Sequence, residues 1–195
     1  MEQPPSTVTT INLPSFEEAL RRAELNLSRS LGGRVTISVH YRLDDDLSEL
    51  IRVIDHERFR EELRYDQAEI EERGATRGFL CLVAYLDGQP VAFDYGYDDE
   101  EEGTFFSDSS ASLIERKGLG TTLFALEIIH DLERGYKAIK LVTEELDEQG
   151  RALRGLWERF GFKQVSVDPV KGIEMRMTLT TEAVADIYER YIGSR

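Results

Sequence analysis

The sequence has a single cysteine, Cys81, among 195 residues. One thiol excludes an intramolecular disulfide framework and any zinc site built from several cysteines. Because Cys81 lies within the apolar run GFLCLVAYL (residues 78–86), a buried strand with a structural thiol is the favoured interpretation. The histidines are dispersed, at His40, His56 and His130, and lack metal-ligand spacing, so no metal site is predicted.

The sequence also lacks an apolar run of the roughly 20 residues that a membrane-spanning helix needs. Its first ten residues, MEQPPSTVTT, have no basic region followed by an apolar core, which argues against a secretory signal. Positive charge is scarce, with 24 Lys and Arg against 38 Asp and Glu and a formal net charge of −14. We therefore expect a cytoplasmic protein with no nucleic-acid or membrane partner, and a cationic or small neutral partner is favoured.

The composition is that of a globular chain, with 41% hydrophobic and 32% charged residues. A chain of 195 residues fits one domain with a substantial core. We expect a single domain over residues 1–195, with a core at about 34–179 and added helices at 13–33 and 181–192.

Hydrophobic periodicity and turn signals predict the order of the elements. Helices are expected at residues 13–33, 44–74 (one or two helices), 119–134, 150–162 and 182–191. Strands are expected at residues 34–43, 79–86, 91–97, 104–110, 137–143, 162–167 and 172–179. This mixed order predicts an α/β fold of the α+β kind around one central sheet.

The stretch ERKGLGTTL (residues 115–123) lies between a predicted strand and a predicted helix. The first turn of a helix has unpaired N–H groups and a partial positive charge, and glycines let an anion approach them. Alone, the two glycines favour a flexible helix start over a phosphate site. The residues of the candidate phosphate site are Arg116, Lys117, Gly118, Leu119, Gly120, Thr121 and Thr122.

The glycine loop, the strand after its helix, and a second helix ending in LWERFGF (residues 156–162) resemble the GCN5-related N-acetyltransferase (GNAT) superfamily. The resemblance covers about residues 34–179 and is most specific over 108–162. It implies a mixed, mostly antiparallel sheet flanked by helices, with acetyl-CoA as acyl donor and no metal. It also implies that backbone N–H groups at 116–122 bind the pyrophosphate, and that the pantetheine arm pairs with residues 108–110, facing 137–143.

Three positions depart from the pattern of that superfamily. Glu115 stands where Gln or Arg is usual, and we expect its carboxylate to point outward, leaving Arg116 as the nearest cation. Gly150 follows an acidic segment (residues 144–149) where Asn is common. Trp157 replaces the tyrosine that protonates the leaving thiolate, and an indole cannot act as that acid; a packing role for Trp157 is favoured.

The resemblance implies direct attack of an acceptor amine on the thioester, which requires removal of an amine proton. Asp108 is the first candidate base, and Asp94 is expected almost opposite it, close enough to raise one of the two pKa values. Glu144 is a second choice. A backbone N–H of Ser109 or Ser110 would polarise the thioester carbonyl. Ordinary polar roles for these carboxylates are equally compatible with the sequence.

The leading hypothesis is thus an acyl-CoA-dependent N-acyltransferase that moves an acetyl group to a small-molecule or peptide amine. The alternative is a non-catalytic acyl-CoA-binding or protein-interaction module of the same fold, which Glu115 and Trp157 favour. The sequence does not name the acceptor, and the flanking helices could either cap the sheet or mediate a homodimer.

Overall fold

The computed structural model describes residues 12–147, 150 and 152–194, so the segment considered above as a signal (residues 1–10) and residues 148–149 of the acidic segment lie outside it. Seven strands form one sheet in the order β1-β2-β3-β4-β5-β7-β6. Neighbouring strands are antiparallel except for the parallel pair β4 and β5, which confirms the mixed, mostly antiparallel sheet. The strands are β1 (Val35–His40), β2 (Leu80–Leu86), β3 (Gln89–Asp98), β4 (Thr104–Ser112), β5 (Ala138–Thr143), β6 (Lys163–Asp168) and β7 (Gly172–Thr178).

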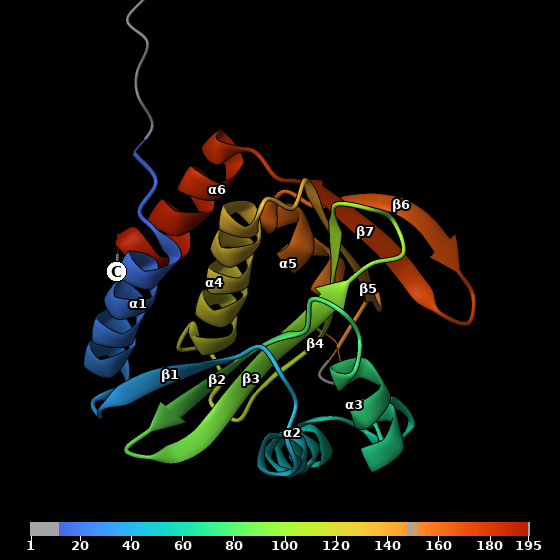
Figure 1. Ribbon diagram of the computed structural model, residues 1–195, viewed down its shortest axis with the longest axis horizontal. Coiled ribbons are helices and arrows are strands. Elements are labelled where there is room, and N and C mark those ends of the chain that lie inside the picture. Colours follow the sequence, from blue (N-terminus) through green and yellow to red (C-terminus); the bar gives the residue numbers. More distant parts are fainter. Residues whose placement is uncertain (1–11, 148–149, 151, 195) are drawn as a thin grey trace, which may run out of the picture.

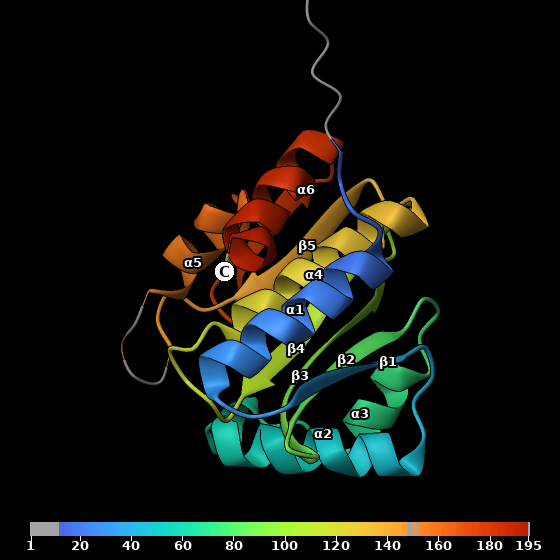
Figure 2. The ribbon, with the colours of Figure 1, turned by 90° about the vertical axis from the view of Figure 1, so that its left-hand side faces the viewer.

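Helices cover both faces of the sheet. The helices are α1 (Phe16–Leu31), α2 (Asp45–Arg58), α3 (Gln67–Gly74), α4 (Leu119–Arg134), α5 (Leu153–Phe160) and α6 (Thr181–Tyr188), with a 3-10 turn η1 (Glu61–Leu63) and a π-helical turn η2 (Glu189–Gly193). Figure 1 shows α1, α4, α5 and α6 on one face and α2 and α3 on the other. After a quarter turn, α1, α4 and α6 lie side by side (Figure 2). No described helix has the length and apolar character needed to cross a bilayer.

Local sequence signals explain most of the helix ends. Ser15 accepts a hydrogen bond from the Glu18 N–H while the Glu18 side chain bonds back to Ser15, which forms a capping box at the start of α1. Gly32 ends α1 in the left-handed conformation, at φ 72°. Gly135 ends α4 in the same way, at φ 92°. The sequence predicted these helices within about three residues because the cap residues are visible in it.

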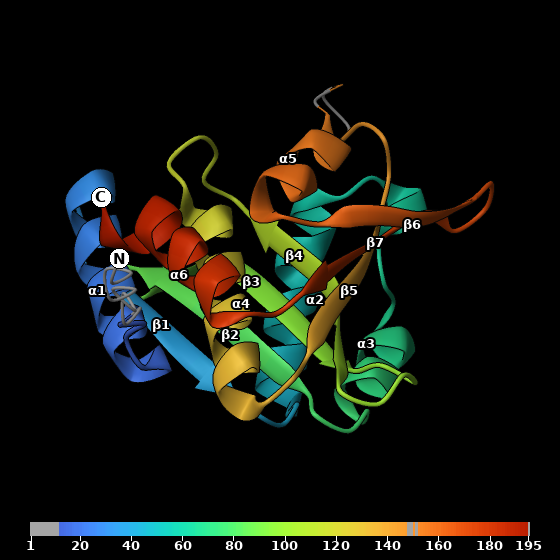
Figure 3. The same cartoon turned by 90° about the horizontal axis from the view of Figure 1, so that it is seen from above.

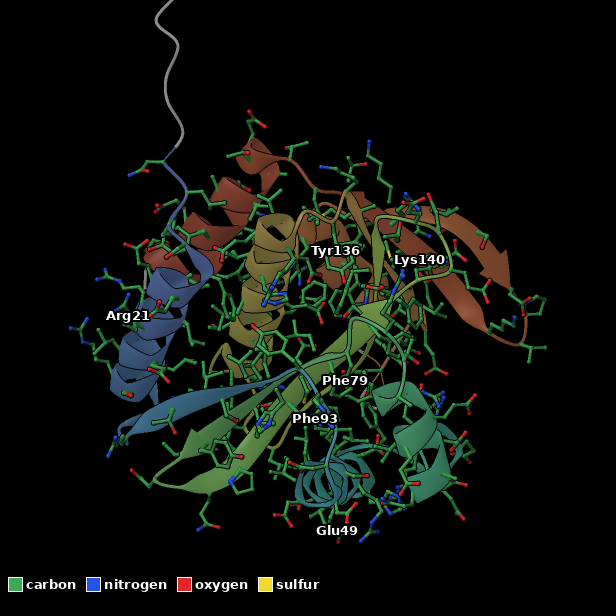
Figure 4. The ribbon with its side chains drawn as sticks, viewed as in Figure 1. Arg21, Glu49, Phe79, Phe93, Tyr136 and Lys140 are labelled. Carbon is green, nitrogen blue, oxygen red and sulfur yellow. The ribbon has the colours of Figure 1, made fainter. Side chains whose placement is uncertain are left out.

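The two faces of the sheet bury separate hydrophobic clusters. Alternate residues of β2, such as Leu80 and Leu82, pack with α1 and α4, while Cys81 and Val83 face the opposite cluster. That second cluster includes Phe79 and Phe93, which lie between the sheet and α2 (Figure 4). Cys81 is completely buried, as a structural thiol would be.

Three carboxyl groups are buried together where α4 crosses the sheet. Asp94 of β3 and Glu127 and Asp131 of α4 are each no more than 1% exposed. Burial raises the pKa of Asp94 to about 8. Burial and the charges of Asp94 and Asp131 raise the pKa of Glu127 well above its ordinary value. Both oxygens of Asp94 lack a hydrogen-bond partner among the described residues.

The neighbouring groups do not neutralise this cluster. His130 Nδ1 lies within hydrogen-bonding distance, 3.1 Å, of Asp131 Oδ1. Burial of the imidazole and, to a smaller extent, the charge of Arg134 lower the pKa of His130 to about 4. The imidazole is therefore neutral at pH 7. Because the cluster has no cation in contact within the part of the chain described here, burial favours the protonated form of its carboxyl groups.

We expect the stability of the protein to fall as the pH rises from about 4 to about 8. In that window folded Asp94, with its raised pKa, binds a proton that the unfolded chain releases near pH 3.8. Asp94→Asn removes the titrating group at residue 94. At pH 8 the free energy of unfolding of this variant should therefore be about 1–3 kcal/mol higher than that of the wild type. Urea unfolding at pH 5, 6.5 and 8 measures the difference.

Glu102→Gln is the matched control, because Glu102 is exposed in the turn before β4. Its stability should follow the wild-type pH profile. An Asp94→Asn variant that loses stability with pH as steeply as the wild type would contradict protonation of this cluster.

Candidate functional site

The glycine loop leads into α4 with its backbone donors free. Gly118 is the N-cap, in the left-handed conformation at φ 78°, and no side chain caps this helix end. The Thr122 N–H makes the first intrahelical hydrogen bond, to the Gly118 carbonyl at 2.9 Å. The N–H groups of residues 118–121 therefore have no acceptor within the helix. No acidic residue lies in the first turn to compete with a bound anion.

Thr122 is the exception among the residues predicted for this site. Its N–H is used within the helix, and its side chain is 1% exposed, with the hydroxyl donating to the Tyr191 carbonyl at 3.4 Å. Thr122 is therefore a packing residue, and the prediction that it offers donors to phosphate is wrong. Thr121 is half-buried, and its hydroxyl donates to the Gly118 carbonyl at 3.0 Å.

Two cations lie directly before the helix. Arg116 and Lys117 are both exposed. Arg116 has a positive φ of 58°, a conformation that is uncommon for a residue with a side chain. The Glu115 carboxylate lies 2.7 Å from the guanidinium of Arg58, the last residue of α2, and its side chain is 32% exposed. This ion pair balances the charge that would otherwise repel a phosphate at the loop.

The strand that leads to the loop is distorted at Asp108. Tyr95 pairs with Ser109 and Gly96 with Ser107, so Asp108 is the extra residue of a β-bulge. On its other side β4 pairs with β5 at three positions, from Thr104 with Ala138 to Phe106 with Lys140. Figure 3 shows the two strands separating beyond these pairs. The predicted residues Ser109 and Ser110 thus lie on the part of β4 that has parted from β5.

Asp108 is surrounded by donors on the face covered by α2 and α3. Its carboxylate accepts hydrogen bonds from the Tyr65 hydroxyl at 3.0 Å, the Tyr97 hydroxyl at 2.8 Å and Arg73 Nε at 2.9 Å. Its side chain is 6% exposed. Burial and the charge of Asp108 raise the pKa of Tyr65 to about 12, so this phenol remains a donor at neutral pH. The network fastens α3 to the bulge of β4.

Asp94 does not lie opposite Asp108, and this expectation was wrong. Asp94 pairs with Ser110 across the hairpin and faces α4, whereas Asp108 faces α2 and α3. The extra bulge residue shifts the register between the two strands, so their carboxyl groups lie on opposite faces. The raised pKa of Asp94 comes from its burial.

Glu144, directly after β5, lies near a segment that crosses toward the glycine loop. Arg60 Nη2 is 2.7 Å from Glu144 Oε1, and both side chains are about half exposed. Arg58, two residues earlier, pairs with Glu115 of the loop. The end of α2 and the connection after it therefore contact both Glu115 of the loop and Glu144 after β5. Sequence analysis missed Arg58, Arg60 and Arg73, because nothing in the chain order pairs them with partners 35 to 84 residues away.

Trp157 packs in an aromatic cluster, as its position on the apolar stripe indicated. Its ring centroid is 4.8 Å from that of Phe124 in an edge-to-face arrangement. The indole Nε1 donates to the Thr143 hydroxyl at 3.0 Å and so ties α5 to the end of β5. Within the described part of the chain, no group of His, Cys, Asp or Glu is arranged to bind a metal ion.

Asp108→Asn should destabilise the protein by about 2–4 kcal/mol, because it leaves the partly buried Arg73 without its counter-charge. Urea unfolding at pH 7 measures the loss. Glu144→Gln is the control: it breaks a half-exposed ion pair and should cost no more than about 1 kcal/mol. Equal stabilities of Asp108→Asn and wild type would show that Asp108 does not anchor α3.

No protein-family model matches the sequence, and no curated protein matches it. Solved structures do match the fold. The ribosomal-protein-S18-alanine N-acetyltransferase of Escherichia coli superposes with a TM-score of 0.60 and 18% identity, over 75% of this chain and 94% of its own. PaiA N-acetyltransferase of Thermoplasma acidophilum, in complex with coenzyme A, has a TM-score of 0.60 and 14% identity, over 74% and 99%.

Aminoglycoside 6'-N-acetyltransferase from Enterococcus faecium also matches, with a TM-score of 0.58 and 20% identity, over 73% of this chain and 96% of its own. A protein of the GNAT family from Desulfovibrio desulfuricans has a TM-score of 0.61 and 18% identity, over 74% and 100%. All these identities are low, so the likeness lies in the fold. The chain has the fold of the GCN5-related N-acetyltransferases, as its glycine loop and LWERFGF helix predicted.

Proposed function

We propose that the protein is an acyl-CoA-dependent N-acyltransferase that transfers acetyl from acetyl-CoA to an amine. One arrangement carries the proposal: a helix start with free N–H groups stands at the end of a strand that bulges and parts from its neighbour. The N–H groups of residues 118–121 suit a pyrophosphate. The unpaired edge of β4 suits an extended pantetheine arm. Three of the structural neighbours named above are N-acetyltransferases, one of them with coenzyme A bound, which supports the proposal.

Each part of acetyl-CoA, the acyl donor, would have its own contacts with the protein. Arg116 and Lys117 supply positive charge beside the pyrophosphate, while Gly120 leaves the backbone bare, since a Cβ there would meet nothing within 4 Å. The carbonyl of the thioester would accept a hydrogen bond from the N–H of Ser109 or Ser110, next to the bulge. Developing negative charge on that oxygen is stabilised there.

The chemistry is direct attack by a neutral amine. The amine nitrogen forms a bond to the acetyl carbon, the C–S bond breaks, and the thiolate leaves with the coenzyme. An amine of pKa about 10.4 must first lose a proton, which costs roughly 4.6 kcal/mol at pH 7. The rate should therefore rise with pH until the amine is deprotonated.

We assign proton removal to Glu144, acting through water. Of the three carboxylates predicted for this role, Asp94 is buried against α4 and Asp108 accepts three donors, whereas the Glu144 side chain is 42% exposed. Water protonates the leaving thiolate in this scheme, because the Trp157 indole is bonded to Thr143 and is not an acid.

The acceptor is proposed to be a cationic amine, either a small molecule or a peptide. The formal net charge of −14 would attract such a substrate and repel nucleic acids and anionic membranes. The structural neighbours differ in the acceptor that their names give: one is named for a ribosomal-protein alanine and another for aminoglycosides.

A non-catalytic acyl-CoA-binding module is the second candidate. Trp157 favours it, because its indole occupies the place of the acid expected by resemblance. Incubation of the protein with acetyl-CoA and a panel of amines, with free thiol followed over time, separates the candidates. Turnover supports the transferase, and binding without turnover supports the module.

Gly120→Ala should keep its fold but bind acetyl-CoA more weakly. Alanine has the higher helix propensity, so stability should not fall, whereas its methyl group stands where the anion approaches. We expect acetyl-CoA affinity to fall by about tenfold or more, measured by calorimetric titration. Gly155→Ala in α5 is the matched control, because a Cβ there meets only the end of Arg159, at 3.8 Å. Wild-type protein that binds no acetyl-CoA at high micromolar concentration would overturn the proposed function.

A further inference from the structure

The strand β6 forms one edge of the sheet, and every one of its six residues is exposed. It pairs with β7 on one side, and no other strand of the described part of the chain lies on its outer side. In Figure 1 the β6–β7 hairpin projects at the right-hand side of the molecule, away from α1, α4 and α6. An edge strand of this kind presents a row of unpaired N–H and C=O groups to solvent.

The opposite edge strand, β1, is closed by the neighbouring helix α1. The Ser28 hydroxyl accepts a hydrogen bond from the Val35 N–H at 2.8 Å, and the Glu24 carboxylate accepts one from the Ile37 N–H at 2.8 Å. Alternate N–H groups of an edge strand point away from its partner strand, so these two side chains cover the donors that β2 does not use. Among the described residues, no side chain covers the backbone of β6 in this way.

Exposed apolar side chains gather near the open edge. Of the eight large hydrophobic residues that are exposed in the described part of the chain, five lie between residues 142 and 170. Two of these, Val165 and Val167, belong to β6 and are 56% and 61% exposed. The strand also has no proline, the residue that commonly prevents an edge from pairing. These features favour a surface that a further strand covers.

The charges of β6 match those of a second β6 that runs in the opposite direction. Lys163 begins the strand, Asp168 ends it, and the four residues between them are uncharged. In an antiparallel pair related by a two-fold axis, Lys163 of each copy can lie opposite Asp168 of the other. Both side chains lie on one face, because Lys163 pairs with Arg176 of β7 and Asp168 pairs with Gly172. The bulge at Val165 produces this agreement, since residues five apart in a regular strand lie on opposite faces.

We propose that β6 pairs antiparallel with β6 of a second copy of this chain, so that the two sheets join across a two-fold axis. The contact forms backbone hydrogen bonds, covers Val165 and Val167, and makes an ion pair between Lys163 and Asp168 at each end. The negative charge of the chain is not concentrated here, because residues 163–176 carry three cations and two acids. The dimer does not use the glycine loop, so its failure would leave the proposed function standing.

Sedimentation equilibrium of the full chain over a range of concentrations measures the dimer. Lys163→Glu places two acids opposite each other at both ends of the contact, so the dissociation constant of the dimer should rise about tenfold. Lys171→Glu is the matched control, because Lys171 is exposed in the turn after β6 and its replacement changes the net charge equally. This control should dimerise as the wild type does.

Asp168→Lys is a second variant that should also dimerise weakly. Its fold is checked by thermal unfolding, because the Asp168 carboxylate accepts hydrogen bonds from the N–H groups of Val170 and Lys171. A mixture of Lys163→Glu and Asp168→Lys restores an opposite-charge pair at both ends, so the mixed dimer should be tighter than either variant alone. Amide hydrogen exchange of residues 163–168 should slow as the wild-type concentration rises.

Two results would overturn the proposal. A wild type that is monomeric at every concentration shows that a second copy does not cover β6 and leaves this edge to a strand of another protein. A dimer that Lys163→Glu weakens no more than Lys171→Glu does forms through a different surface, such as the flanking helices α1 and α6.

Discussion

The free N–H groups at the start of α4 are the feature on which the site depends. They are available because Gly118 caps the helix without a side chain and because no acid occupies the first turn. Their position follows from β4, which bulges at Asp108 and separates from β5 just before the loop. A helix start of this kind binds anions by geometry alone, so side chains add charge rather than the basic recognition.

The two faces of the sheet bear different networks of ionisable groups. On one face Asp108 accepts hydrogen bonds from Tyr65, Tyr97 and Arg73, which joins α3 to the bulge. On the other face the carboxyl groups around Asp94 are buried against α4, and burial raises the pKa values of Asp94 and Glu127. Asp108 is the bulge residue itself, and Asp94 pairs with Ser110, two residues further along β4, so each network has one member at or beside the bulge.

Charged residues at and after the end of α2 pair with acids on both sides of the site. Arg58 pairs with Glu115, the position whose negative charge departs from the GNAT pattern, and thereby offsets it. Arg60 makes the matching contact with Glu144 at the end of β5. On the far side of the loop, α1 and η2 form the wall of a pocket around Asn26. The loop is thus contacted on one side by the end of α2, which belongs to the core, and bordered on the other side by α1 and η2, which lie outside it.

The sequence alone determined the order of elements, the ends of α1 and α4, and the glycine loop, because caps, periodicity and glycines are local signals. It also predicted the burial of Cys81 and the packing of Trp157 from their apolar surroundings. The partners of Asp108 and Glu115, the use of Thr122 within the helix and the separation of Asp94 from Asp108 were decided by tertiary structure. One extra residue in β4 changes which face a side chain occupies, and pairings between distant segments have no signature in a single sequence.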